Sequence, residues 1–457
     1  MSADEVLKYI ATNEIRWVDL QFFDLAGRLH KTTVSNKDID EYAFTKGTYA
    51  ANLSEIFGPS PQGELLLLPD ANSLARMPWE PSSIRLMCDI VVAGTGERFL
   101  KDSRYVAQRA QTNLEALGVK ASRIGLTTEF YIMDSATMDR TTKGRGTTMV
   151  MDSRESYWSP SPLSTAKSGA YLSQPYDSMY AARVQVAETL EDHFGVIIDA
   201  HRHGKGKTSQ QSIDLHEQNL MSIADGFVTL KFVVRNLANA VNAATTFMPY
   251  PIEGESGSSL SVSMSLWKTG ENNVFYEGTD EYAQVSQIGR YFIGGLLEHA
   301  AALSLFTMPT ANSYKRLSIN PKIVAWSKTN KSALVEVPHV RKNDKEGKRI
   351  VFTAADPSIN SHLALAAIIT AGVDGIKRKV DPGDPTDDEK GEVKKRKWEA
   401  LPTSLYEAIQ AFEADPKFVK GVIPTELLEN YIDLKVTEFE ESQRSLTAWE
   451  LQEYWNF

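Results

Sequence analysis

The segment at residues 199–207 reads Asp-Ala-His-Arg-His-Gly-Lys-Gly-Lys and is rich in side chains that could do chemistry. On a regular strand, Asp199, His201 and His203 would share one face, because side chains two residues apart point the same way. Imidazole and carboxylate ligands in that arrangement could hold zinc or copper. The alternative is solvated histidines beside a basic turn, and both interpretations stay open on this pattern.

The second half of the same segment alternates glycine with lysine. Backbone N–H groups and ammonium charge at residues 204–207 could bind a phosphate or a carboxylate. The spacing differs from that of a phosphate-binding P-loop. The pattern therefore indicates an anion site of no particular class.

A strand with an all-serine face is predicted at residues 259–266, where serine alternates with apolar residues. The alternation places four hydroxyls on one face and four apolar side chains on the other. Burying a hydroxyl unpaired costs about 1–3 kcal/mol, so this face must meet water or a polar cleft. It does not build a metal site by itself, because hard cations favour carboxylates and carbonyls.

The elements that must position these groups are predicted from periodicity, with short strands first and alternating strands and helices beyond. Expected strands lie at 15–24, 29–34, 65–68, 85–92, 124–133, 196–200, 245–249 and 259–266. Expected helices lie at 180–194, 225–240, 288–303 and 361–376, with others beginning near Ser103 and at a capping box on Ser404. The break near residue 101 is the expected domain boundary.

Composition narrows the function classes. Hydrophobic residues make up 42% of the 457, which excludes a wholly disordered chain. The net charge of -10 argues against nucleic acid and anionic membranes as partners. The single cysteine, Cys88, excludes an internal disulfide and, with no signal peptide or membrane segment visible, predicts a cytoplasmic protein. The charged segment 377–397 is interpreted as a solvated loop.

Motifs along nearly the whole chain, in order and spacing, match those of one family. They include Val-Asp-Leu-Gln-Phe at 18–22, Thr-Phe-Met-Pro at 246–249, Ser-Leu-Trp at 265–267 and Asn-Ser-Tyr-Lys-Arg-Leu at 312–317. On these motifs the chain resembles the type I glutamine synthetases, enzymes of nitrogen metabolism. The resemblance implies an α+β fold: a small N-terminal β-grasp domain, 1–101, and a large catalytic-type domain, 102–457, built on a curved antiparallel sheet with helices outside. It also implies a homo-oligomer, a dodecamer of two hexameric rings.

The family's chemistry needs residues that this sequence largely replaces. Glutamate is activated as an acyl phosphate from ATP, and Mg²⁺ or Mn²⁺ neutralises the phosphates. At positions that match the family's metal ligands, the chain carries Thr127, Gly204, Ser212, Ser261 and Val351. Glu129 alone remains, as a candidate catalytic acid or base. From these replacements we expect no bound metal and no cofactor, although ATP with Mg or Mn is what the family implies.

The resemblance also implies a basic cleft that could bind a substrate or another anion. Arg202 and Gly204 should face it, so that His201 and His203 point away. The residues that the family register brings near the cleft are Arg202, Lys205, Lys207, Lys315, Arg316, Lys331 and Gly257. A family segment that reaches the neighbouring subunit's site is replaced around residues 51–54.

Three hypotheses follow from the replaced positions. The first is a pseudoenzyme that makes no glutamine and has a structural or regulatory role, with an active glutamine synthetase paralogue as a possible partner. The second is a metal-independent enzyme, or a binder of an anionic small molecule in the remodelled cleft. The third is a divergent ATP-dependent acid–amine ligase. The retained residues could also be structural only.

Overall fold

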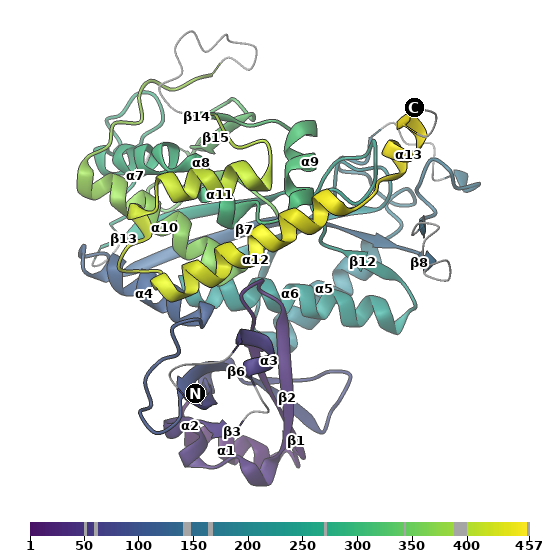
Figure 1. The fold of residues 1–457 in the computed structure, drawn as a ribbon, viewed down its shortest axis with the longest axis vertical. Helices are drawn as coiled ribbons and strands as arrows, with labels where there is room; N and C mark the ends of the chain where they lie inside the picture. The colour runs from purple at the N-terminus through teal and green to yellow at the C-terminus, as the bar shows by residue number, and fades with distance from the viewer. Residues whose placement is uncertain are drawn as a thin grey trace.

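The protein is described by a computed structural model covering residues 1–49, 53–58, 63–139, 148–162, 168–268, 272–341, 344–387 and 400–454. Two sheets with separate hydrophobic cores organise these residues. The N-terminal sheet forms a small body beside a large body of helices wrapped on the second sheet (Figure 1). Residues 51 and 52 of the replaced family segment, and residues 388–397 of the charged segment, lie outside the described residues.

The N-terminal body is a β-grasp domain, with its six-stranded sheet ordered β2-β1-β6-β4-β3 and β5 beside β6. Its strands are β1 Trp17–Phe23, β2 Leu29–Ser35, β3 Thr48–Tyr49, β4 Leu65–Pro69, β5 Ala75–Arg76 and β6 Ser83–Val92. Its helices are α1 Ala3–Thr12, α2 Glu41–Lys46 and α3 Ser54–Phe57, with 3-10 turns η1 Asn36–Asp38 and η2 Ala71–Ser73. Alternate residues of β1 and β6 fill its core, which explains the strand periodicity in the sequence.

The large body is built on an eight-stranded sheet ordered β10-β11-β7-β13-β16-β15-β14, with β12 beside β7. Its strands are β7 Ala121–Met133, β10 Ile198–His203, β11 Gln210–Gln218, β12 Ala244–Thr246, β13 Leu260–Trp267, β14 Ile323–Ser327, β15 Ala333–Glu336 and β16 Ile350–Ala355. They pair antiparallel except for β14 with β15. A separate hairpin joins β8 Ser135–Asp139 to β9 Thr148–Asp152.

The large body also contains ten helices in the described residues, some of which cover the apolar side of this sheet. They are α4 Ser103–Glu115, α5 Tyr180–Phe194, α6 Leu220–Ala240, α7 Gln287–Glu298, α8 Ala300–Thr307, α9 Ala311–Ile319, α10 Ser361–Arg378, α11 Leu405–Ala414, α12 Thr425–Arg444 and α13 Ala448–Tyr454, with a 3-10 turn η4 Lys417–Val419. The apolar residues of β7 and β13 join α6, α7 and α10 in one core. The opposite face of β7 and β13 is thereby left for polar residues.

Most predicted elements are present, and the differences have local causes. The helix expected at 225–240 begins earlier, at Leu220, because the Asn219 side chain caps it. The helix expected at 288–303 is two helices, α7 and α8, that meet at the buried His299. At Ser404 the capping box is incomplete, since the Glu407 carboxylate accepts a hydrogen bond from the N–H of Thr403, at 2.7 Å.

The strands expected at 196–200 and 245–249 are shifted or shortened. The first is β10, displaced toward the C-terminus with a bulge between Ile198 and Ala200. The second, β12, ends at Thr246 before the Pro249 turn. The domain boundary expected at residue 101 lies between β6 and α4 and stays a prediction. No helix in the described ranges is long and apolar enough to cross a membrane.

Candidate functional site

The polar face of the large sheet brings together positions far apart in the sequence. The pairing register puts Thr127 opposite Ser261, and Ser263 opposite Val351. On the other side of β7, Glu129 lies opposite Ser212, which in turn lies opposite Arg202. The serine face predicted for 259–266 therefore lies on the same side of the sheet as Glu129 and four of the five replaced positions.

Two neighbouring cavities lie over this face, and we call them together the sheet cleft. One has a volume of about 310 Å³ and is lined by Glu129, Lys205, Gly257, Ser259, Arg316, Lys322, Lys331 and Glu336, among others. The other has a volume of about 420 Å³ and is lined by residues that include Thr127, Ser263, Arg341, Arg349 and Val351. Ser261 lines both. Three of the four serines thus line a polar cleft, as one of the two sequence interpretations holds, while Ser265 is buried and accepts a hydrogen bond from Trp267 at 2.9 Å.

Glu129 is held at the cleft by Ser259, the residue before β13. One of its carboxylate oxygens, Oε2, accepts hydrogen bonds from the Ser259 N–H at 2.9 Å and from the Ser259 hydroxyl at 2.6 Å. Its backbone N–H donates to the Ser259 carbonyl at 2.9 Å. The acid is therefore fixed in position, as an acid, a base or a ligand would need to be.

Arg316 enters the cleft from α9 and is buried, with 2% of its surface exposed. Its Nε and Nη2 make no hydrogen bond to any described residue. Burial lowers the pKa of this guanidinium, against the opposing charges of Asp356 and Glu129. An anion in the cleft would supply the missing acceptors.

Three lysines add to the positive charge. Burial, with the charges of Arg316, Lys205 and Lys331, lowers the pKa of Lys322 to about 8, against the attraction of Glu336. Lys331 forms an ion pair of 2.7 Å with Glu336. The cleft therefore presents more cations than acids to a ligand.

The expected anion-binding residues divide into two groups. Lys205, Arg316, Lys331 and Gly257 line the 310 Å³ cavity together with Glu129. Arg202, Lys207 and Lys315 do not line it. Arg202 instead pairs with Asp214 at 2.7 Å, the Lys207 N–H donates to Glu255 at 2.8 Å, and Lys315 is exposed.

The sequence interpretation missed Lys322 and Glu336. Lys322 follows the shortened loop after α9, and Glu336 ends β15. No motif marks either residue. The chain path through the 318–322 loop is the one feature that could have indicated Lys322.

The metal clasp considered for Asp199, His201 and His203 is wrong, because each side chain has another partner. Asp199 pairs with His216 at 2.7 Å, and His201 Nδ1 accepts from Arg183 at 3.4 Å. His203 is buried, with Nε2 at 2.8 Å from Glu155 and Nδ1 at 2.9 Å from the Gly204 carbonyl. Burial disfavours the charged imidazole, but these hydrogen bonds outweigh it and raise the pKa of His203.

The remaining replaced position, Gly204, closes the turn after β10. Its N–H donates to the Gln210 carbonyl at 2.7 Å, and an added Cβ would lie 2.8 Å from the Gln210 side chain. Within the part of the chain that the structure describes, no three His, Cys, Asp or Glu side chains form a group that could hold a metal by themselves.

The chain is similar to glutamine synthetases over its whole length. Residues 14–93 match the family model described as "Glutamine synthetase, beta-Grasp domain", and residues 100–454 match "Glutamine synthetase, catalytic domain". It is 37% identical to a glutamine synthetase of Sulfolobus acidocaldarius, with 98% of each chain covered. It is 33% identical to one of Aquifex aeolicus, covering 99% of this chain and 98% of that one, and 31% identical to one of Methylococcus capsulatus over both whole chains.

Solved structures share the fold. A Plasmodium falciparum glutamine synthetase matches with a TM-score of 0.89 at 24% identity, covering 99% of both chains. A structure titled "Apo GmaS without ligand" matches with a TM-score of 0.83, also at 24% identity and 99% coverage of both chains.

These relatives correct the expectation that the chain needs no cofactor. That expectation is wrong, because relatives at 31–37% identity are named glutamine synthetase and the family implies ATP and divalent metal. The hypothesis of a metal-independent enzyme loses its basis with it.

The residues present fit such a ligand in part. Mg²⁺ is commonly held by one or two carboxylates, several waters and the phosphates of its substrate. Glu129 and Glu336 could supply carboxylates, and Lys205, Arg316 and Lys322 could contact phosphate oxygens. The replaced positions concern protein ligands alone, whereas a nucleotide brings phosphate oxygens as further ligands. Members of this family are typically homo-oligomers, and with both domains and the fold matched, the chain belongs to the glutamine synthetase family.

Proposed function

We propose that this chain binds a phosphate-bearing ligand in the sheet cleft, with ATP and its divalent ion as the family ligand, but does not ligate ammonia to glutamate. Its role is then structural or regulatory, within a homo-oligomer of two hexameric rings. The observation that carries the proposal is the composition of the cleft. Thr127, Ser261 and Val351 offer no carboxylate or imidazole, while Arg316 and three lysines surround the space.

The chemistry explains why binding and ligation can separate. Phosphate binding needs cations and hydrogen-bond donors, which the cleft has. Phosphoryl transfer to glutamate also needs the developing charge neutralised at fixed positions, which the family does with several metal ligands. Glu129 alone at those positions can orient one substrate-borne ion but not the full set.

Two measurements test the proposal. Calorimetric titration of ATP with MgCl₂ should give binding, weakened about tenfold or more in Lys322→Gln, because a hydrogen bond to a charged group is worth about 1.5–3 kcal/mol. Lys315→Gln is the matched control, since this exposed lysine does not line the cavity. Phosphate release with glutamate, ammonium, ATP and Mg²⁺ or Mn²⁺ should stay at the no-enzyme level. Release that depends on both ammonium and glutamate would overturn the proposal.

Returning metal ligands to the face gives a second test. In the double variant Thr127→Glu/Ser261→His, two new ligands stand on paired positions of β7 and β13. Mn²⁺ affinity should rise at least about tenfold over the unchanged chain, because carboxylate and imidazole replace two hydroxyls. The uncharged variant Thr127→Gln/Ser261→Asn is the control for altered packing. An unchanged Mn²⁺ affinity would mean that this face of the sheet does not correspond to the one that carries the family's metal ligands.

A second candidate is a divergent ATP-dependent acid–amine ligase, and the fixed position of Glu129 favours it. Phosphate release screened over paired acids and amines separates the two proposals. A productive pair whose turnover is lost in Glu129→Gln would favour the ligase.

The assembly has its own test. Mass photometry of the chain alone should give a homo-oligomer of twelve subunits. Mixing with an active glutamine synthetase from the same cell tests the proposed paralogue partnership, and persistence of two unmixed species would argue against it.

A further inference from the structure

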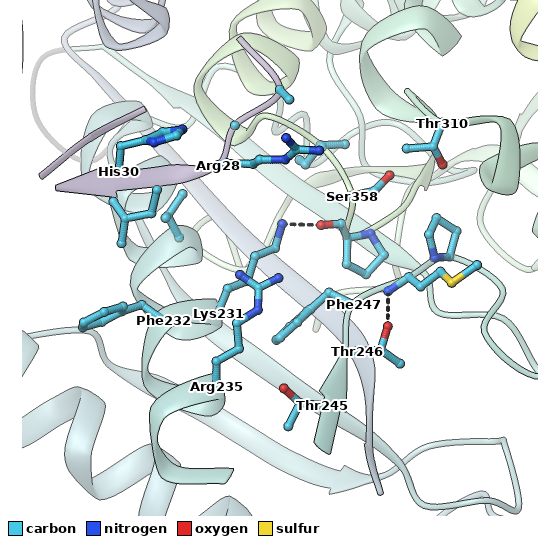
Figure 2. A pocket seen from close by; sticks show the side chains of 18 of the residues that line it. Arg28, His30, Lys231, Phe232, Arg235, Thr245, Thr246, Phe247, Thr310 and Ser358 are labelled. Atoms are coloured by element: carbon cyan, nitrogen blue, oxygen red, sulfur yellow. Dashed lines mark hydrogen bonds between the residues drawn. The ribbon is translucent and has the colours of Figure 1, made fainter. Parts of the chain in front are cut away.

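A third cavity, of about 890 Å³, lies where the turn between β1 and β2 meets α6 (Figure 2). We call it the turn pocket, and its walls come from this turn, from α6, from residues 245–249 and from residues 357–359. It shares no lining residue with the sheet cleft. Gly27, at φ +80°, lets the turn approach α10 closely, since an added Cβ would lie 2.6 Å from the Asn360 Cα. The pocket therefore lies at a closely packed interface between the N-terminal domain and the large domain.

Two cations one helical turn apart face this pocket from α6. The Lys231 ammonium donates to the Pro357 carbonyl and lies 4.4 Å from the centroid of the Phe227 ring. The Arg235 guanidinium lies 5.5 Å from the centroid of the Phe247 ring. Neither forms an ion pair with any acid in the described ranges. Figure 2 shows both side chains extending from α6 into the pocket, with Lys231 hydrogen-bonded to a carbonyl and Arg28 on the turn across from them.

The environment disfavours the charge on both cations. Burial and, to a lesser extent, the charge of Arg235 lower the pKa of Lys231 to about 7, against the attraction of Asp356. Burial also lowers the pKa of Arg235. A bound anion would oppose both effects, because it would add negative charge beside these two cations.

Other charges at the rim do not neutralise the pocket. Among its described lining residues, five are Lys or Arg and one, Glu438, is an acid. Glu438 forms an ion pair with Lys435, at 2.8 Å. On β2, Lys31 pairs with Asp19 at 2.7 Å. Lys231, Arg235 and Arg28 are therefore the cations left for a ligand.

Part of the remaining wall is apolar, beside polar residues that include Thr245, Thr246 and Asn312. Val228, Phe232, Phe247, Met248 and Ile359 line it. Phe247 is fixed by stacking on Phe130, with ring centroids 4.8 Å apart. An apolar wall with a few converging polar groups is typical of small-molecule sites.

We propose that the turn pocket binds a small organic anion, with its carboxylate or phosphate against Lys231 and Arg235 and its apolar body on Phe232 and Phe247. Arg28 gives a third contact from the N-terminal sheet. The ligand then bridges the β-grasp domain and the large domain at a place separate from the sheet cleft. This inference does not depend on the proposed function of the cleft.

Calorimetry and thermal shift on the full chain at pH 7 test this proposal with three probes: benzoate, phenyl phosphate and the neutral benzamide. We expect at least one anion to bind and to raise the melting temperature, and benzamide to bind about tenfold more weakly or not at all. The two anions distinguish a carboxylate from a phosphate ligand.

Variants then locate the binding. Arg235→Gln and Arg28→Gln should each weaken the anion about tenfold. Arg444→Gln, an exposed arginine on α12 that does not line the pocket, should leave it unchanged. Lys322→Gln in the sheet cleft should also leave it unchanged.

Four outcomes would overturn the proposal: no binding by either anion, equal binding of benzamide, binding unchanged in both pocket variants, or binding lost in Lys322→Gln. The test uses Arg235→Gln and Arg28→Gln and leaves the buried Lys231 unchanged, so it does not depend on whether a Lys231→Met variant folds.

Discussion

Because Gly257 has no side chain, Arg316 can occupy the space beside it in the sheet cleft. A Cβ on Gly257 would lie 2.4 Å from the Arg316 Cγ and 2.7 Å from the Pro249 carbonyl oxygen. The backbone oxygen cannot move away cheaply, so Gly257→Ala should lower the free energy of unfolding by about 1–3 kcal/mol. Arg316 should shift, and ATP binding should weaken with it. Chemical denaturation and calorimetry measure the two effects.

The matched control is Gly226→Ala in α6. There the nearest atoms to an added Cβ are the Val196 methyls at 3.6 and 3.7 Å, which is ordinary contact. In a helix interior, alanine should stabilise by about 0.5–1 kcal/mol relative to glycine. Equal effects of the two substitutions would contradict the role given to Gly257.

At this same scale, part of the cleft was predictable from the sequence. The motif register found Glu129, Arg316, Lys331 and Gly257, because these residues stand in or beside matching motifs. Lys322 and Glu336 were missed, because their positions at the sheet cleft depend on how the loop at residues 318–322 leads into β14. Arg202 was expected at the cleft, but its side chain pairs with Asp214. Side-chain partners of this kind are not encoded in strand periodicity.

Among the elements, the junction of α7 and α8 depends on one histidine. The apolar periodicity of residues 288–303 continues through His299, which is why the sequence indicated a single helix. In the structure His299 Nδ1 lies 2.5 Å from Asp415 and Nε2 lies 2.9 Å from Asp374, so the ring ties the junction to α10 and to the end of α11. A polar residue with two distant partners cannot be recognised from local pattern.

This tie predicts a pH-dependent stability. Burial disfavours the charged imidazole, but the hydrogen bonds to Asp374 and Asp415 outweigh it and raise the pKa of His299 to about 9, from a usual 6.5. The stabilisation is therefore fully present below about pH 6.5 and is lost as the pH rises through about 9. His299→Gln should lower the free energy of unfolding by up to about 3 kcal/mol at pH 6. At pH 10, mainly the loss of stacking on Phe418 should remain.

Denaturant unfolding of both proteins at the two pH values measures this difference. His216→Gln is the control, since His216 makes the same kind of pair with Asp199 on the exposed surface. An exposed pair is worth about 0–1 kcal/mol, so its loss should change little at either pH. A cost of His299→Gln that is the same at pH 6 and pH 10 would argue that the imidazole is neutral in the fold.

At the scale of the whole molecule, the ion pairs of a buried arginine join the two sheets. Figure 1 shows the β-grasp domain as a small body that meets the large one below α4 and α6. Arg104 at the start of α4 is 1% exposed and reaches both bodies. It pairs with Asp89 at 2.5 Å and Asp70 at 3.1 Å on the N-terminal side, and with Asp225 of α6 at 2.8 Å.

The charges in this joint depend on one another. Burial disfavours the Arg104 cation, but the three carboxylates outweigh it and hold its pKa well above the usual value. In turn, Arg104 and His362 keep the pKa of Asp225 below its usual value, against the effect of burial. Removing this buried arginine would take from three half-buried acids the cation that they share, and breaking a buried pair typically costs about 3–5 kcal/mol.

Arg104→Met should therefore weaken the joint more than either sheet. In calorimetry we expect the β-grasp domain to melt in a transition of its own, below that of the large domain, with a total loss of about 3–5 kcal/mol at pH 7. The loss should shrink as the pH falls toward about 4, because the acids left behind become protonated. Arg98→Met is the matched control, since Arg98 pairs with Asp89 and Asp102 but not with α6. If Arg98→Met separates the transitions as much as Arg104→Met does, the joint does not depend on the link to Asp225.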